Sequence, residues 1–276
     1  MSTPSGILFA KAYEQQHRGL LLEAIALYDQ VLALEPNHPD ALHFLALCYA
    51  QLGDLDKALV LFNQALELHP QDPGILNNLA NVYKKNQRWE EAITYYLKAL
   101  SIAPDYAQAH NNLATIYALQ NAYKQALMHY QKALEIAPDL TMAHFNLGLL
   151  FLNNKQLSAA KTQFNNVIAL NPEHTEAQFY LGVLALEDQE LDEAEQAFQT
   201  VLEFDSEHTE ALTNLGVIAL KRKQNQLAIN FFTQALALDN NHVAARNNLA
   251  ATFIHFDRFE NALTHYEWLL TQDPNN

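Results

Sequence analysis

The sequence contains twelve histidines, side chains well suited to binding a transition metal ion, and four of them recur at a fixed spacing. His174, His208 and His242 lie 34 residues apart, and His38 falls in the same register further upstream. Equivalent residues of neighbouring packed units are on the order of 10 Å apart, whereas a metal–nitrogen bond is ~2 Å long. We therefore expect no metal site and assign these histidines to turns between repeating units.

Other residues that could catalyse a reaction lack the neighbours that catalysis requires. The sequence has no Gly-x-Ser-x-Gly, Gly-x-Gly-x-x-Gly or Walker motif, so neither an activated serine nor a phosphate-binding loop is predicted. The single cysteine, Cys48, lies between Leu47 and Tyr49 in a helical pattern and is expected to be a small core residue. Acidic pairs such as Glu90 and Glu91 are expected on a solvated surface. We predict a protein that is not an enzyme and needs no cofactor.

A repeat of 34 residues, present in eight copies without an insertion, must position all of these side chains. One alanine recurs in every copy, as Ala24, Ala58, Ala92, Ala126, Ala160, Ala194, Ala228 and Ala262. Four residues later stands an aromatic ring, as Tyr28, Phe62, Tyr96, Tyr130, Phe164, Phe198, Phe232 and Tyr266. Twelve residues before the alanine stands a small residue, as Ala12, Ala46, Ala80, Ala114, Gly148, Gly182, Gly216 and Ala250. Small residues let two helix axes approach closely, so each copy is predicted to be a helical hairpin.

The second helix of most copies ends before a proline, at Pro36, Pro70, Pro104, Pro138, Pro172 and Pro274. Together these columns resemble the tetratricopeptide repeat. The resemblance implies an all-α fold, a right-handed superhelical solenoid of antiparallel helix pairs, whose first helices (A helices) line a concave groove for a peptide or partner. After a lead of residues 1–4 we expect one solenoid over residues 5–276, with repeats 5–38, 39–72, 73–106, 107–140, 141–174, 175–208, 209–242 and 243–276.

The formal net charge of −15 argues against nucleic acid and anionic membranes as partners, because both require clustered Lys and Arg. Twelve acidic residues from Glu173 to Glu210 occur without one Lys or Arg among them, which indicates a solvated acidic face or a surface for a basic partner. The apolar stretches are too short for membrane insertion, and a signal peptide pattern is lacking. We expect a cytoplasmic protein, with export by a route without a cleaved signal as the alternative.

Binding residues are expected on the face of each A helix that lies opposite the core. With each repeat numbered from 1, position 6 is asparagine in five repeats, as Asn78, Asn112, Asn146, Asn214 and Asn248. Asn77, Asn81, Lys84 and Asn111 share this region. Because an amide both donates and accepts, the column suits the backbone of an extended peptide, and the alternative is asparagine that simply faces water. The column resembles that of O-linked N-acetylglucosamine transferases, which implies peptide capture that tolerates many side chains.

Further along the sequence the same face becomes apolar, with Phe145, Leu149, Phe179 and Val183. Glu176 and Glu210 fall beside these residues, so we expect a protein or peptide ligand with an apolar stretch flanked by basic residues. Packing between neighbouring A helices is the alternative explanation of the apolar positions.

The most consistent function is a non-catalytic scaffold for protein–protein interaction that binds an extended peptide or a partner helix in its concave groove. The alternative is the substrate-recruiting N-terminal part of a larger glycosyltransferase or methyltransferase, with the catalytic domain after residue 276. The last repeat keeps its core residues without a polar helix to cover them. Self-association through this uncapped end is therefore a further expectation.

Overall fold

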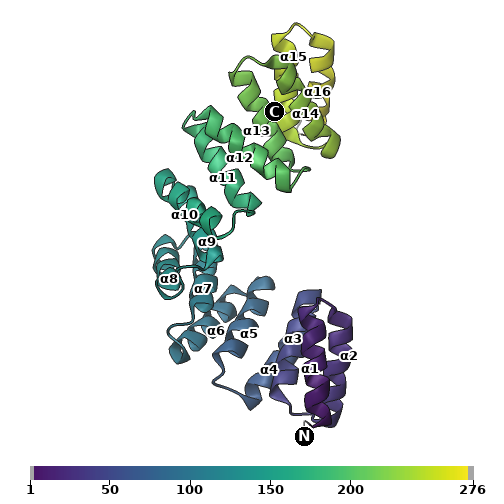
Figure 1. Cartoon of the computed structure of the whole chain (residues 1–276), viewed down its shortest axis with the longest axis vertical. Coiled ribbons are helices and arrows are strands. Elements are labelled where there is room, and N and C mark those ends of the chain that lie inside the picture. Colours follow the sequence, from purple (N-terminus) through teal and green to yellow (C-terminus); the bar gives the residue numbers. More distant parts are fainter. Residues whose placement is uncertain (1–2, 273–276) are drawn as a thin grey trace. The chain divides into compact units, whose positions relative to one another are not determined.

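The structure is a computed structural model that describes residues 3–272, and over that range it contains sixteen α-helices and no strand (Figure 1). The helices are α1 (Pro4–His17), α2 (Leu21–Leu34), α3 (Pro39–Leu52), α4 (Leu55–Leu68), α5 (Pro73–Lys85), α6 (Trp89–Ile102), α7 (Ala107–Leu119), α8 (Tyr123–Ile136), α9 (Thr141–Asn153), α10 (Leu157–Leu170), α11 (Thr175–Glu187), α12 (Leu191–Phe204), α13 (Thr209–Lys221), α14 (Asn225–Leu238), α15 (Val243–His255) and α16 (Phe259–Gln272). Residues 1 and 2 of the expected lead and residues 273–276 of the expected last repeat, Pro274 among them, lie outside the described residues.

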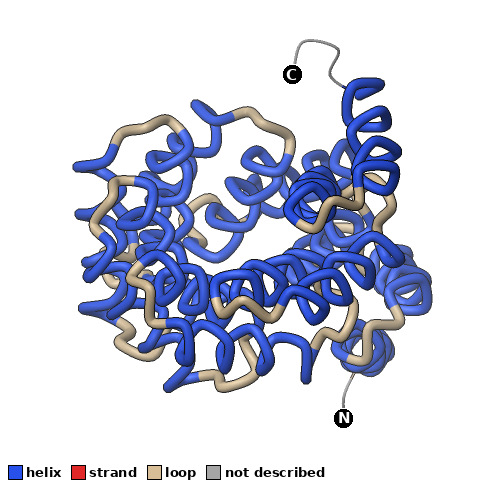
Figure 2. The backbone as a smooth tube through the Cα atoms, turned by 90° about the horizontal axis from the view of Figure 1, so that it is seen from above, coloured by secondary structure: helices blue, strands red, loops and turns tan. Residues whose placement is uncertain are grey.

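The helices form two compact units, Met1–Asn146 and Leu147–Asn276, which we describe separately. In the first unit α1 packs on α2, α3 on α4, α5 on α6 and α7 on α8, and the second helix of each pair also contacts the first helix of the next. In the second unit α11 to α16 repeat this arrangement. The connections are short loops, as the tube drawing shows (Figure 2). This is the expected all-α solenoid of antiparallel helix pairs.

The core of each pair consists of the predicted small and aromatic columns. The alanine column and the rings four residues later are buried in the first seven repeats, and Tyr266 of the last repeat is half-buried. Tyr28, Tyr96 and Tyr130 keep their hydroxyls hydrogen-bonded, to Gln16, Asn81 and Thr115 respectively. A buried ring with a satisfied hydroxyl fills the space between helices without leaving an unpaired polar group.

Glycine replaces alanine in the small column of three repeats, where the facing phenylalanine ring lies very close to the backbone. A Cβ added to Gly148, Gly182 or Gly216 would lie 2.7, 2.8 or 2.4 Å from the nearest ring carbon of Phe164, Phe198 or Phe232. These distances are far below ordinary van der Waals separation, so the glycines are required by close packing and not by a turn.

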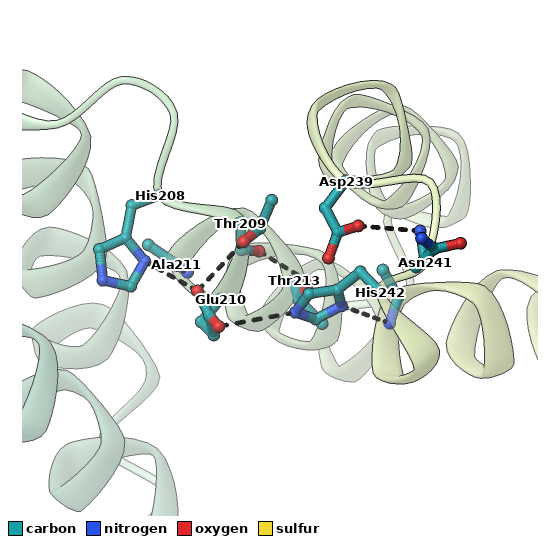
Figure 3. Close-up of polar contacts among 9 residues, drawn as sticks. His208, Thr209, Glu210, Ala211, Thr213, Asp239, Asn241 and His242 are labelled. Atoms are coloured by element: carbon teal, nitrogen blue, oxygen red, sulfur yellow. Dashed lines mark hydrogen bonds and ion pairs between the residues drawn. The ribbon is translucent and has the colours of Figure 1, made fainter.

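The recurring histidines lie in the turns before A helices, as predicted, and each has a defined role there. His38, His174, His208 and His242 are the N-cap residues of α3, α11, α13 and α15. In each, Nδ1 accepts a hydrogen bond from the backbone N–H three residues later, at 3.1–3.3 Å (Figure 3). The imidazole thus satisfies one of the donors that a helix start leaves unpaired.

Candidate functional site

Six side chains in the first unit form a row of hydrogen bonds between successive A helices, which we call the asparagine row. It consists of His43, Asn77, Asn78, Asn111, Asn112 and Asn146. Three bonds join residues 35 positions apart: Asn78 Nδ2 donates to His43 Nε2 at 2.9 Å, Asn112 Nδ2 to Asn77 Oδ1 at 3.4 Å, and Asn146 Nδ2 to Asn111 Oδ1 at 3.1 Å. Position 6 of one repeat is therefore held by position 5 of the repeat before it.

Burial divides the asparagine row into inner and outer members. Asn77 and Asn111 are buried, with 4% and 6% of their surface exposed, whereas Asn78, Asn112 and Asn146 are half-buried. An amide has two N–H groups, and each outer asparagine uses one of them in a hydrogen bond to another described residue. The outer amides are fixed in orientation and keep a second N–H that no described residue accepts.

Lys84 adds a positive charge to this surface. Its Nζ donates to Asn112 Oδ1 at 3.2 Å, and burial lowers the pKa of its ammonium group. Lys85 donates to the Ala50 carbonyl at 3.0 Å. Asn81 accepts the hydrogen bond of the buried Tyr96 hydroxyl. The sequence analysis placed Asn81 among the binding residues and did not predict this contact. Lys84 and Asn81 are both half-buried, as the outer asparagines are.

The predicted apolar residues lie on two A helices, Phe145 and Leu149 one turn apart on α9, and Phe179 and Val183 one turn apart on α11. Phe145, Leu149 and Val183 are half-buried. Phe179 stacks on the N-cap residue His208, with ring centroids 4.9 Å apart, and lies 5.6 Å from Phe198. Phe9 stacks on His38 in the same way at 5.2 Å. Phenylalanine at position 5 therefore supports the next helix start, a role that sequence reasoning missed.

Asn214 in α13 and Asn248 in α15 differ from the asparagines of the first unit. Both are half-buried, and neither makes a side-chain hydrogen bond to another described residue. The residue at position 5 of the preceding repeat is Phe179 or Thr213, and neither forms the bond seen in the asparagine row. Their amides are uncommitted within the described part of the chain.

A second polar feature, which the sequence analysis did not single out, is a pair of buried histidines. His110 Nδ1 and His129 Nδ1 are 2.9 Å apart, and His110 Nε2–H donates to the Pro104 carbonyl at 3.1 Å. His110 Nδ1 must then be the acceptor and His129 Nδ1–H the donor. Burial lowers both pKa values, and the charge on His110 further lowers that of His129, to about 4. Both side chains line a cavity of about 350 Å³.

The last repeat has a buried cation at the position equivalent to His110. The guanidinium of Arg246, 6% exposed, lies 4.1 Å from the centre of the Trp268 ring and donates to the carbonyl and side chain of Asn240. His265, equivalent to His129, lies 3.3 Å away. His110 and His129, like Arg246 and His265, are polar residues 19 apart in the sequence. That spacing was the signal that could have indicated the two contacts.

Acidic helix α12 is joined to its neighbours by the two cations that flank the acidic segment. Lys161 of α10 lies 3.0 Å from Glu190, just before α12, and 3.5 Å from Glu193 within it. Arg222 forms ion pairs with Asp192 and Glu195. These pairs join half-buried cations to carboxylates of which Asp192 and Glu193 are exposed, and the other acidic side chains of the segment, such as Glu187 and Glu203, are exposed to solvent.

Two features of the described residues bear on the chemistry that they could perform. Burial raises the pKa of Cys48 to about 11, so its thiol is not a ready nucleophile at neutral pH. Among residues 3–272 no group of three or more His, Cys, Asp or Glu is placed to hold a metal ion. Within the same range, no helix has the length and apolar character that crossing a membrane requires.

Two protein-family models match the sequence. One is described as the cilia and flagella-associated protein 70 C-terminal domain and matches residues 71–272. The other, anaphase-promoting complex, cyclosome, subunit 3, matches residues 17–99. A comparison with curated proteins returned no match.

Solved structures of similar fold include three that bear on the architecture. YrrB, described as a TPR protein with an unusual peptide-binding site, is 27% identical over 67% of this chain and 95% of its own, with a TM-score of 0.57. Pseudomonas aeruginosa pilF is 23% identical over 75% of this chain and 95% of its own, with a TM-score of 0.69. The APC/C hetero-tetramer Cut9-Hcn1 aligns with 99% of this chain and 54% of its own, at 21% identity and a TM-score of 0.66.

Proposed function

The chain belongs to the family of the cilia and flagella-associated protein 70 C-terminal domain and is a tetratricopeptide repeat protein, and from this premise we propose that it is a non-catalytic scaffold that binds an extended peptide along its A helices. The tetratricopeptide fold itself suggests a role in protein–protein interaction. YrrB, a similar TPR protein with a peptide-binding site, supports the more specific proposal of peptide binding.

The observation that carries this proposal is the fixed orientation of Asn78, Asn112 and Asn146. Each is held by the preceding repeat and keeps an N–H that can donate to a peptide carbonyl. Because the amides are already ordered, binding loses little side-chain entropy. Lys84, an ammonium with three donors and one described hydrogen bond, adds a further donor next to Asn112.

In the second unit we propose that the ligand has an apolar stretch with basic flanks. Phe179 and Val183 are half-buried beside Glu176 and Glu210, whose side chains are exposed. Glu210 lies between His208 and His242, at 3.5 and 3.9 Å, and keeps its carboxylate near the surface (Figure 3). Asn214, with its uncommitted amide, is the polar residue that we expect to orient such a ligand.

Replacing Asn146 with alanine is expected to weaken peptide binding about fivefold, the effect of losing one neutral hydrogen bond of ~1 kcal/mol. The measurement is fluorescence anisotropy, with the full chain and a labelled peptide selected on it from a random phage-displayed library. The matched control is Asn111→Ala, which removes the same bond between repeats but keeps the outer amide.

Equal losses in Asn146→Ala and Asn111→Ala would show that only the bond between repeats matters. That result would contradict a direct role of the outer amide. Selection of no peptide on the intact chain would contradict peptide binding as a whole.

We also propose that α16 mediates self-association. Phe259, Leu263 and Leu270 are 58%, 57% and 49% exposed, whereas the equivalent residues of α4, Leu55, Leu59 and Leu66, are half-buried against the next repeat. The outer face of α1 carries Lys11 and Glu14 where later repeats bury apolar residues, so it does not suit this surface. We therefore propose a symmetric contact between the α16 helices of two copies.

Light scattering is expected to show an average mass that rises with protein concentration, and a lower mass for Leu263→Glu at the same concentration. A constant monomer mass would contradict the proposal.

A further inference from the structure

Between α10, α11 and α12 of the second unit lies a cavity of about 310 Å³, at a place that a stacked pair of rings fills in three other repeats. Its lining includes Ala185 and Ala197, with Leu181 and Gln178 from the A helix and Lys161 and Glu193 at flanking positions. The volume is about twice the ~150 Å³ of an engineered protein cavity that binds benzene. An aromatic side chain therefore fits the available space.

The repeats themselves show what occupies this place elsewhere. The residues equivalent to Ala185 and Ala197 are Tyr83 and Tyr95 in repeat three, with ring centroids 5.4 Å apart and planes at 7°. They are Tyr117 and His129 in repeat four, at 5.7 Å and 20°. They are Phe253 and His265 in repeat eight, at 5.9 Å and 15°. Repeat six alone has alanine at both positions and so lacks the stacked pair of rings.

The polar residues around the cavity favour a ring that carries a hydroxyl group. Gln178 and Gln196 provide amide donors and acceptors within the lining. Lys161, whose ammonium group also pairs with Glu190 and Glu193, provides a cation, and in repeat three Arg88 lies 4.7 Å from the centre of the Tyr83 ring and Lys98 4.9 Å from that of Tyr95. Tyrosine is the side chain that combines an aromatic face with a group that these amides can bind.

We propose that the cavity at Ala185 and Ala197 receives a tyrosine side chain of a protein partner, which replaces the ring pair that repeat six lacks. The proposal rests on the scaffold role of the protein and not on the asparagine row, which lies in the first unit. The partner thus completes the packing of the repeat when it binds. Such a partner is recognised through one exposed tyrosine side chain.

The first test uses the full chain and N-acetyl-tyrosinamide, with alanine methyl groups labelled for NMR. The methyl resonances of Ala185 and Ala197 are expected to shift on titration, and N-acetyl-leucinamide is expected to shift them at least tenfold less at equal concentration. Absence of a shift, or an equal response to the leucine amide, would overturn the proposal. Neither outcome depends on peptide binding at the asparagine row, so failure of one proposal is distinguishable from failure of the other.

The second test fills the cavity from within the chain. Ala185→Tyr combined with Ala197→Tyr rebuilds the ring pair of repeat three, and saturation transfer to N-acetyl-tyrosinamide is expected to fall at least tenfold while the thermal midpoint rises. Ala197→Phe alone is a second filled variant. It copies the alanine and phenylalanine of repeat seven, Ala219 and Phe231, which the fold already accommodates. Gln199→Tyr, at an exposed position of α12, is the control and should bind as the wild type does. Undiminished binding by a folded filled variant would overturn the proposal.

Discussion

Replacing Phe198 with alanine is expected to lower the free energy of unfolding of the second unit by about 3–5 kcal/mol. The ring is fully buried, lies 5.6 Å from the ring of Phe179, and packs directly on Gly182. Because its neighbour across the helix pair is already a glycine, no side chain is available there to fill the space left by the ring. Urea unfolding followed by circular dichroism measures the change.

Phe204→Ala is the matched control, because Phe204 lies in the same helix and is 51% exposed. Its effect is expected to stay within about 0.5 kcal/mol, as is usual for a surface substitution. Similar losses in the two variants would mean that the ring column does not carry the packing energy assigned to it.

Acidification from neutral pH to pH 4 is expected to destabilise the first unit by about 3 kcal/mol through His110 and His129. Burial lowers both pKa values from 6.5, and that of His129 falls to about 4. As the pH falls below 6.5, each histidine becomes protonated in the unfolded chain while it stays neutral in the folded chain. The free energy of unfolding therefore has its full value above pH 6.5 and decreases as the pH falls towards the folded pKa. Protonation also removes the lone pair that accepts the hydrogen bond between the rings.

Urea midpoints measured across this pH range test the prediction, with His110→Leu/His129→Leu as the comparison. Repeat two already has leucine at both equivalent positions, Leu42 and Leu61, so the variant copies packing that the fold uses. The variant should lose most of the pH dependence between 6.5 and 4. Asp54 and Glu91, whose pKa values are lowered by Lys57 and Arg88, lose their stabilising effect as the pH falls through about 4.5 and below, so they contribute only at the acid end of that window. An unchanged dependence in the variant would assign the effect to other groups.

The helix pairs could be predicted from the sequence because their packing depends on residues that recur at one spacing. Ala194 and Phe198, for example, are both buried, and the small residue facing them, Gly182, is set by the approach of that same ring. The histidine turns followed from the same spacing. The 34-residue period identifies the packing of these recurring columns, since both partners belong to the same repeat, but not pairs found in single repeats such as His110 and His129.

The asparagine row could not be predicted in this way, because its bonds join position 5 of one repeat to position 6 of the next. Asn77 and Asn112 are 35 residues apart, so neither column by itself indicates that the two amides meet. Phe179 and His208 were likewise considered separately, one as a ligand contact and one as a turn residue, although they stack on each other. What the sequence could not supply was which columns touch one another, whether across a repeat boundary, as in the asparagine row, or within one repeat, as Phe179 and His208 do.

The regular step of the asparagine row has a consequence for the ligand that we propose. Asn78, Asn112 and Asn146 lie one in each of the three successive repeats three to five, and successive packed helices are ~10 Å apart. A polyproline II segment makes one turn of three residues in about 9 Å, whereas side chains of a β-strand alternate with a period of two. Only the polyproline form presents the same edge to every repeat. The expected signature in a partner is therefore a motif of three-residue periodicity, rich in proline, whose length grows by one triplet for each repeat engaged.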